Sequence, residues 1–195
     1  MSLGKQAKTL SKQQQDAVLS YLTTTRHPLR NKVIFLLSAR AGLRSKEIAC
    51  LTWGMLTDAE GQVSDAINLQ DIASKGKSGG VVWMSKGLRA ALAELRAESG
   101  AAISSDHIIR TERRKSTSAQ SIVNMFWGWY RNLGFDGCSS HSGRRTFITN
   151  AARKISTVGG SIRDVQMLAR HSSLNMTMKY VDADKDAMRK VVELV

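Results

Sequence analysis

The residues with the clearest chemical potential lie between positions 141 and 180. His141 and Arg144 form an HxxR motif, and His171 and Tyr180 follow it further along the chain. Arginine stays protonated and grips phosphate with paired hydrogen bonds, histidine exchanges protons near neutral pH, and a tyrosine phenolate is a nucleophile. Together these groups predict an enzyme that attacks a phosphodiester with a tyrosine.

A second candidate group precedes this stretch. Arg44 lies at the start of a short predicted helix that Ser45 can cap, and Glu47 is three residues further on. A carboxylate at that spacing can reach back and hold the guanidinium group. The alternative is a solvated surface ion pair of little energetic consequence, which is the better interpretation of the pair taken alone.

A lysine-bearing hairpin is predicted in the first half of the chain. The segments 66–69 and 81–84 have the composition of strands, and the turn at 75–80 is rich in glycine and lysine. This turn places Lys75 and Lys77 at its tip. By composition alone, such a tip is ordinarily a solvated turn with no further role.

Helices are expected around these motifs. Trp127 and Trp129 are expected in the core, and a short helix capped by Ser172 or Ser173 is expected to carry Tyr180. Apolar spacing and capping signals predict the other helices. Four of these helices are expected at residues 11–22, 88–95, 146–155 and 187–195. Three more are expected: one that ends at about Gly42 in a left-handed turn, one that begins at Ser118, and one that runs from Ser161 to residue 170.

The composition points to a polyanionic partner. The 195 residues include 29 Lys and Arg against 16 Asp and Glu, a net charge of +13. This excess favours nucleic acid over a membrane surface, although a basic protein without such a partner is the simpler alternative. Residues 1–12 contain no signal peptide, no apolar run approaches a membrane span, and the two cysteines form no disulfide framework. We therefore expect a cytoplasmic protein that binds nucleic acid and does not contact membranes.

The order and spacing of these motifs resemble the catalytic domain of a tyrosine recombinase of the phage integrase family. The matching elements are the segment 41–48, the lysine hairpin, the HxxR motif, and the segment from His171 to Tyr180. The likeness runs from about residue 9 to the C-terminus. It implies a tyrosine recombinase catalytic-domain fold, which is mainly α-helical with a small antiparallel β-sheet (α+β).

The resemblance implies a role for each motif residue. Tyr180 is the expected nucleophile, which forms a 3′-phosphotyrosyl bond and frees a 5′-hydroxyl group. Arg44 and Arg144 are expected to clamp the non-bridging oxygens of the scissile phosphate, where two guanidinium groups offset the charge on the pentavalent phosphorus. Glu47 is expected to support Arg44.

The resemblance also implies roles for three other residues. Lys75 would protonate the departing 5′-oxygen, His141 would exchange a proton with the tyrosine, and His171 would donate to a phosphate oxygen. Lys77 competes with Lys75 for the role of the acid. No cofactor or metal is implied, because the arginines supply the positive charge. A metal site at the two histidines is disfavoured, since no cysteine or carboxylate lies at ligand spacing near them.

Three residues depart from the family's pattern. Arg145 stands where the family often has histidine, and we expect it to face a phosphate or to be structural. Ala169 and Arg170 replace the common Leu-Gly before the second histidine, which bears on the turn at the end of that helix. The predicted DNA-binding residues outside the catalytic set are Lys77, Arg145 and Arg170.

The resemblance also sets expectations for the organisation of the chain. Residues 1–8 are expected to form a disordered basic lead, and residues 9–195 the catalytic domain, with a tail helix at 186–195. Many members of the family carry a separate N-terminal core-binding domain, and none is expected in this chain, which would be either one of the short recombinases or a fragment of a longer protein. Double-stranded DNA is the implied partner, with self-association into a tetramer on the DNA through the tail.

The expected function is site-specific recombination, in which DNA strands are cleaved and rejoined to integrate, excise or invert mobile DNA. Two alternatives remain. One is a type IB topoisomerase-like enzyme that relaxes supercoils with the same chemistry. The other is a DNA-binding accessory protein that keeps the fold without the activity, and the complete catalytic set argues against it.

Overall fold

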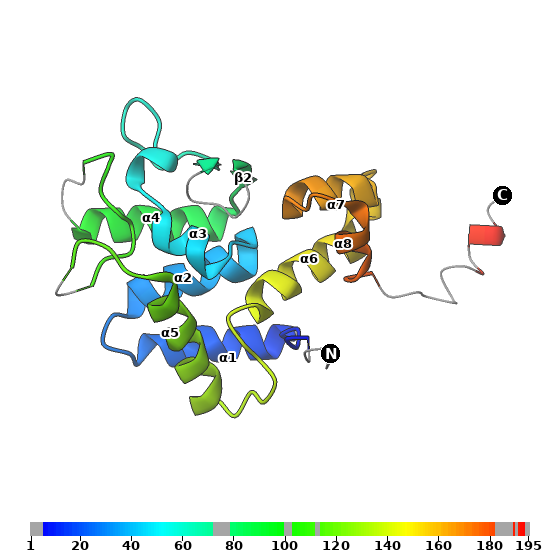
Figure 1. Cartoon of the computed structure of the whole chain (residues 1–195), viewed down its shortest axis with the longest axis horizontal. Helices are drawn as coiled ribbons and strands as arrows, with labels where there is room; N and C mark the ends of the chain where they lie inside the picture. The colour runs from blue at the N-terminus through cyan, green and yellow to red at the C-terminus, as the bar shows by residue number, and fades with distance from the viewer. Residues whose placement is uncertain are drawn as a thin grey trace. The chain divides into compact units, whose positions relative to one another are not determined.

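The structure, a computed structural model, describes residues 6–71, 79–99, 103–111, 114–181, 189 and 191–193. The chain divides into two compact units, Met1–Phe147 and Ile148–Val195 (Figure 1). Helix α6 (Ser142–Lys154) begins in the first unit and ends in the second.

The first unit is built on helix α2 (Pro28–Ala41). This helix is apolar around most of its circumference, and Val33, Ile34 and Leu37 are completely buried, as expected for a helix inside a core. It packs against α1 (Lys12–Thr23), α3 (Ser45–Cys50) and α4 (Lys86–Ser99). The C-terminal end of α2 matters for the candidate site, because it leads directly into Arg44.

Local sequence signals set several helix ends. Ser11 caps α1 reciprocally: its Oγ accepts a hydrogen bond from the Gln14 N–H at 3.1 Å, and Gln14 Oε1 accepts one from the Ser11 N–H at 2.9 Å. Gly42 ends α2 in the left-handed conformation with φ of 66°, which residues with a Cβ rarely adopt. Both features confirm the prediction from sequence.

Helix α5 (Ala119–Asn132) follows its predicted N-cap, Ser118, and packs against α1 and α3. Phe126 and Trp129 lie on its buried face, with their ring centroids 5.2 Å apart. The prediction that Trp127 lies in the core was wrong, because its side chain is 59% exposed. It projects from the other face of the helix, where the Arg131 guanidinium carbon lies 5.0 Å from the centre of its ring.

The sheet is a two-stranded antiparallel hairpin, β1 (Ala66–Leu69) and β2 (Gly80–Trp83), with Ile67 opposite Val82. The inward residues of both strands are buried, whereas Val81 and Trp83 are exposed. Strand β2 starts at Gly80, one residue before the start that the sequence composition predicts. Where the chain continues beyond β1, Asp71 Oδ1 accepts a hydrogen bond from the Gly79 N–H at 2.9 Å.

The second unit contains the end of α6, the 3₁₀ helix η3 (Ile155–Val158), α7 (Ile162–Ala169) and α8 (Leu174–Met178). Ser161 begins α7 as predicted: its N–H donates to Asp164 Oδ2 at 2.7 Å and its hydroxyl to the same oxygen at 2.8 Å. These hydrogen bonds lower the pKa of the Asp164 carboxyl. Helices α7 and α8 pack against each other.

Three predicted helix boundaries were wrong. Helix α6 begins at Ser142, four residues before the predicted start, because tertiary contacts hold its first turn. Arg44, not Ser45, is the N-cap of α3, since the Glu47 carboxylate satisfies the Arg44 N–H. Helix α8 ends at Met178, so Tyr180 lies in the following turn, where its N–H donates to the Thr177 carbonyl at 2.9 Å.

The predicted fold class is confirmed: the described chain is mainly helical and contains one small antiparallel sheet. Across the described ranges, every helix is too short or too polar to cross a membrane.

Candidate active site

Arg44 is held by a buried carboxylate. Glu47 Oε2 accepts a hydrogen bond from the Arg44 N–H at 2.7 Å, and Oε1 accepts one from Arg44 Nη1 at 2.8 Å. The Glu47 side chain is 1% exposed and that of Arg44 is 25% exposed. A carboxylate removed from water in this way is stable only beside a cation, so the pair is not the solvated surface contact that the sequence alone favours. The guanidinium group is thereby oriented while part of it still faces solvent.

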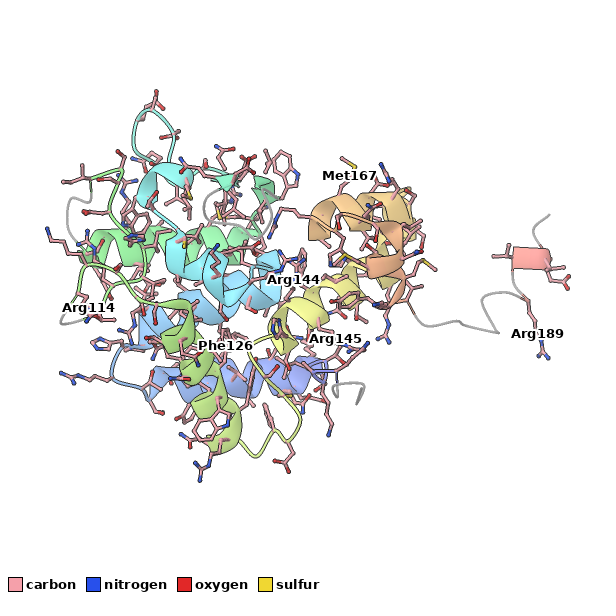
Figure 2. All side chains as sticks on the ribbon, in the orientation of Figure 1. Arg114, Phe126, Arg144, Arg145, Met167 and Arg189 are labelled. Carbon is pink, nitrogen blue, oxygen red and sulfur yellow. The ribbon has the colours of Figure 1, made fainter. Side chains whose placement is uncertain are left out.

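Arg144 projects from the first turn of α6 (Figure 2), and its side chain is buried, with 5% exposed. Its Nη1 donates a hydrogen bond to the carbonyl oxygen of Gly42, at the end of α2. Gly42 lies two residues before Arg44, so the structure brings both predicted arginines to the same turn. Two guanidinium groups at one turn are suited to bind a phosphate or another oxyanion.

The left-handed turn at Gly42 also has no room for a side chain. A Cβ at this position would lie 2.5 Å from Cδ1 of Phe147, on the second turn of α6. Glycine is therefore required here for two reasons, the positive φ and the close approach of an aromatic ring. The same glycine supplies the carbonyl group that Arg144 contacts.

The first turn of α6 is anchored by hydrogen bonds from distant segments. Thr146 Oγ1 accepts a hydrogen bond from the Leu10 N–H at 2.7 Å and donates one to the Ser142 carbonyl, also at 2.7 Å. Ser142 Oγ in turn accepts from the Ser139 N–H at 3.0 Å. Thr146 is 1% exposed, so these bonds are shielded from water and stabilise the turn that carries Arg144.

Residues that sequence analysis assigned to a disordered lead take part in this anchoring. The Lys8 N–H donates to the Gly137 carbonyl at 3.0 Å, and Arg145 Nη1 donates to Gln6 Oε1. The segment from Gln6 to Leu10 is therefore bound to α6 and to the loop before it. Arg145, predicted to face a phosphate or to be structural, makes a structural contact in this arrangement.

His141 lies immediately before α6, and its side chain is exposed. Its N–H donates to Ser139 Oγ at 3.3 Å, and its carbonyl accepts a hydrogen bond from the Arg145 N–H at 2.9 Å. The backbone of His141 is thus held through both its N–H and its carbonyl, and in the HxxR motif the His141 side chain is exposed whereas that of Arg144 is buried. An exposed imidazole can exchange protons with solvent or with a bound substrate.

His171 and Tyr180 lie side by side in the second unit. Their ring centroids are 5.6 Å apart with an angle of 27° between the ring planes. His171 is 7% exposed, and its Nδ1 lies 2.9 Å from Oγ1 of Thr177, which is completely buried. The threonine hydroxyl fixes the plane of the imidazole, so the stacked histidine limits the orientations open to the phenol.

The backbone around His171 is also held. Gln166 Nε2 donates to the His171 carbonyl at 3.0 Å, and the His171 N–H donates to the Gln166 carbonyl at 3.1 Å. Arg170, at the end of α7, has φ of 52° and ψ of 47°, the left-handed conformation of a helix C-cap. The turn that ends α7 is therefore formed by arginine in a conformation that glycine adopts more readily, at some cost in backbone strain.

Sequence reasoning missed two supporting residues, Thr177 and Gln166. Each is buried and hydrogen-bonded to His171. In the sequence, the only signal for them is a polar residue five or six positions from His171, and this signal is weak because polar residues are common on the surfaces of helices. Lys75 and Lys77, the two candidates for the general acid, lie outside the described residues.

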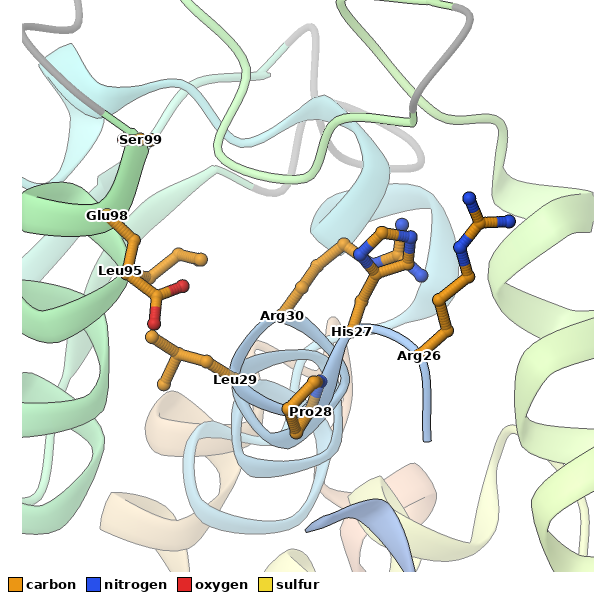
Figure 3. A pocket seen from close by; sticks show the side chains of 8 residues that line it. All are labelled: Arg26, His27, Pro28, Leu29, Arg30, Leu95, Glu98 and Ser99. Carbon is orange, nitrogen blue, oxygen red and sulfur yellow. The ribbon is translucent and has the colours of Figure 1, made fainter. Parts of the chain in front are cut away.

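Other features of the described chain do not belong to this site. A pocket of about 300 Å³ lies at the opposite end of α2 from Gly42 (Figure 3). No predicted site residue lines it; its walls are formed by Arg26, His27, Pro28, Leu29, Arg30, Leu95, Glu98 and Ser99. Within the described ranges, no three His, Cys, Asp or Glu side chains gather as a metal site.

The fold of this chain is similar to that of several solved DNA recombinases. The XerA recombinase has 20% sequence identity and a TM-score of 0.71, with all of this chain and 65% of XerA covered. The Tn1549 transposon integrase in complex with transposon right end DNA has 18% identity and a TM-score of 0.74, covering 98% of this chain and 66% of that chain. A lambda integrase dimer bound to a core site has 16% identity and a TM-score of 0.67, and the match covers 90% of this chain and 48% of the lambda integrase chain.

The structural similarity at these low sequence identities shows a shared fold. This chain spans about two thirds or less of the length of each of the three proteins. A search of the curated proteins gave no match. The sequence model of the phage integrase family matches residues 8–187, which is most of the chain and includes every predicted catalytic residue. The chain therefore belongs to the phage integrase family.

Proposed function

We propose that this chain is a site-specific DNA recombinase that cleaves and rejoins duplex DNA through a 3′-phosphotyrosyl intermediate on Tyr180. The observation that carries the proposal is the pair of arginines at one turn, each held by a specific contact: Arg44 by Glu47, and Arg144 by the Gly42 carbonyl. Held guanidinium groups need little rearrangement to stabilise the extra charge of a pentavalent phosphorus.

In this proposal the phenolate oxygen of Tyr180 forms a bond to phosphorus, and the bond from phosphorus to the 5′-oxygen breaks. The phenolic proton passes to His141, and the departing 5′-oxygen takes a proton from Lys75. His171 donates to a non-bridging oxygen. Attack by the 5′-hydroxyl of another strand reverses these transfers and releases the tyrosine, so the reaction needs neither ATP nor an external nucleophile.

We further propose that the reaction proceeds without a metal ion, because two arginines and a lysine supply the positive charge that Mg²⁺ supplies in many phosphoryl-transfer enzymes. Residues 9–195 would form the catalytic domain, and Lys77, Arg145 and Arg170 would contribute to binding the DNA backbone. Cleavage that is equally fast in buffer with EDTA and in buffer with Mg²⁺ would support the metal-free reaction.

Self-association on DNA is a further part of the proposal. Val191 and Val192 in the tail are 57% and 69% exposed, and apolar side chains on a short terminal helix are stabilised by docking on another surface. We propose that the tail docks on a neighbouring copy and that four copies assemble around two duplexes. Such a protein acts where the cell keeps its DNA, which in a bacterium is the cytoplasm.

The test of the chemistry is a nicked suicide substrate, from which a short 5′-hydroxyl fragment diffuses away and traps the covalent adduct. The wild-type chain should form an adduct of protein and DNA, whereas Tyr180→Phe should form none and should bind DNA within a few-fold of wild type. An adduct on the phenylalanine variant would exclude Tyr180 as the nucleophile. Recombination between two sites, measured beside relaxation of a plasmid without sites, separates a recombinase from a topoisomerase-like enzyme.

The assignment of the general acid has its own test. Lys75→Ala should cleave ordinary DNA slowly, and cleavage should recover when sulfur replaces the 5′-bridging oxygen, because a thiolate leaves without a proton. Recovery by Lys77→Ala instead would move the role to Lys77.

A further inference from the structure

Helices α2 and α6 touch at a point where neither has a large side chain. Gly143 is buried in the first turn of α6, and Ser38 on α2 is completely buried. A Cβ added at Gly143 would lie 2.5 Å from Ser38 Oγ, 3.0 Å from Ser38 Cβ and 3.2 Å from the backbone nitrogen of Ala39. Carbon atoms in good contact lie about 3.5–4.0 Å apart, so this contact has no space for a methyl group.

The contact lies next to the candidate phosphate-binding arginine. Gly143 directly precedes Arg144, whose guanidinium group reaches the Gly42 carbonyl. Ser38 is one helical turn before Gly42 in α2, and its carbonyl accepts the Gly42 N–H at 3.1 Å. Helix α6 is therefore docked on α2 at two neighbouring points, through the Ser38–Gly143 contact and through the hydrogen bond of Arg144.

The hydroxyl group of Ser38 does not explain this contact by hydrogen bonding. Ser38 Oγ is buried and has no hydrogen-bond partner among the described residues. A buried hydroxyl without a partner generally lowers stability, so replacing Ser38 by alanine should not disturb the first unit. The small size of both residues is the feature that the contact depends on.

We propose that Gly143 is a positioning residue for the DNA-cleavage reaction, because its close contact with Ser38 sets the position of Arg144 relative to Arg44. This inference rests on the proposed function. A methyl group at position 143 acts as a wedge between α2 and the first turn of α6. Relief of the contacts requires a movement of roughly half an ångström to one ångström, judged from normal contact distances, and a misplacement of about 1 Å can slow an enzyme by about a hundredfold.

The experiment compares two glycine-to-alanine variants at matched helix positions. Gly143 is the second residue of α6, and Gly87 is the second residue of α4, where an added Cβ would meet no atom within 4 Å. Both substitutions bring the same gain in helix propensity. In single-turnover cleavage of the suicide substrate at saturating DNA, Gly143→Ala should be slower by about tenfold to a hundredfold, while Gly87→Ala should match wild type.

A second variant tests the proposed cause. Ser38→Ala removes Oγ, the atom nearest the methyl group added at position 143. The double variant Ser38→Ala/Gly143→Ala should therefore recover part of the lost cleavage rate. Recovery should be partial, because the Cβ of residue 38 and the Ala39 nitrogen remain at 3.0 and 3.2 Å. No recovery in the double variant, with both proteins folded, would overturn the Ser38–Gly143 contact as the cause.

A third measurement distinguishes a displaced arginine from a generally loosened fold. A methylphosphonate at the scissile position is neutral and has less need of a positive guanidinium group. The Gly143→Ala defect should therefore shrink to within about threefold on this substrate, whereas a loosened fold would slow cleavage of both substrates equally and would refute the positioning role.

Two controls keep the outcomes separate. Absence of any adduct with the wild-type chain would refute the proposed function itself, whereas a wild-type adduct with wild-type cleavage by Gly143→Ala refutes only the present inference. Should Gly143→Ala fail to fold, Ser38→Cys crowds the same contact from α2 by replacing oxygen with the larger sulfur. Cleavage at the wild-type rate by a folded Ser38→Cys variant would then overturn the proposal.

Discussion

Replacing Glu47 by glutamine tests whether the buried carboxylate holds Arg44 in place. The Glu47 side chain is 1% exposed and accepts hydrogen bonds from the Arg44 N–H and from Nη1, at 2.7 and 2.8 Å. Glutamine keeps the shape of the side chain but has only one oxygen. One of the two donors then faces an NH₂ group and loses its hydrogen bond.

The expected loss follows from the number and kind of bonds broken. One hydrogen bond that involves a charged group stabilises a protein by about 1.5–3 kcal/mol, so we expect the free energy of unfolding to fall by about 2 kcal/mol. The larger loss of about 3–5 kcal/mol for breaking a fully buried ion pair does not apply, because Arg44 is 25% exposed and water can solvate it. Cleavage should slow by about a hundredfold where the guanidinium group moves by about 1 Å.

Urea unfolding and single-turnover cleavage of the suicide substrate measure the two effects. The matched control is Glu94→Gln, because Glu94 pairs with Lys32 at 3.9 Å and both side chains are well exposed, 59% and 45%. The control should change the free energy of unfolding by less than about 0.5 kcal/mol. Equal unfolding curves for the two variants, together with wild-type cleavage by Glu47→Gln, would show that the Arg44–Glu47 pair is an ordinary surface contact.

Three further predictions concern the second unit and the tail. Arg170→Gly should be more stable than Arg170→Ala by about 1–2 kcal/mol, because both remove the side chain and only glycine is free of strain at φ of 52°; equal melting temperatures would contradict this. Thr177→Val removes the buried contact with His171 Nδ1, so it should cost about 1 kcal/mol and slow cleavage without weakening DNA binding, whereas unchanged cleavage would show that the contact does not orient the imidazole. Deleting residues 187–195 should reduce recombination between two sites far more than single-site cleavage, and equal loss of both activities would place the tail on its own subunit.

Most helix and strand positions could be predicted because they depend on neighbouring residues. The Ser11 cap, the left-handed glycine at position 42 and the Ser161–Asp164 cap each involve groups within five residues of one another. Such contacts depend little on how the distant parts of the chain pack. The order of the motif residues likewise sufficed to identify the family, because it does not depend on how the segments pack.

The errors occurred where distant segments decide the local conformation. Helix α6 extends back to Ser142 because Leu10 and Gly42 bind its first turn, from more than a hundred residues away in the sequence. The error at Trp127 has a local cause instead, because helical spacing already places Trp129 on the face of Ile122 and Phe126 and Trp127 on the other face, which stays exposed when α5 packs against α1 and α3.

The sequence by itself determined which residues could carry out the chemistry, since side-chain type and motif order are properties of the chain. The tertiary structure alone decided how those side chains are held. Burial of the Glu47 carboxylate distinguishes the Arg44–Glu47 pair from a solvated surface contact. The close approach of Gly143 to Ser38 placed Arg144 against the Gly42 carbonyl. The physical reason is that exclusion of water and close packing arise only when segments distant in the sequence come together.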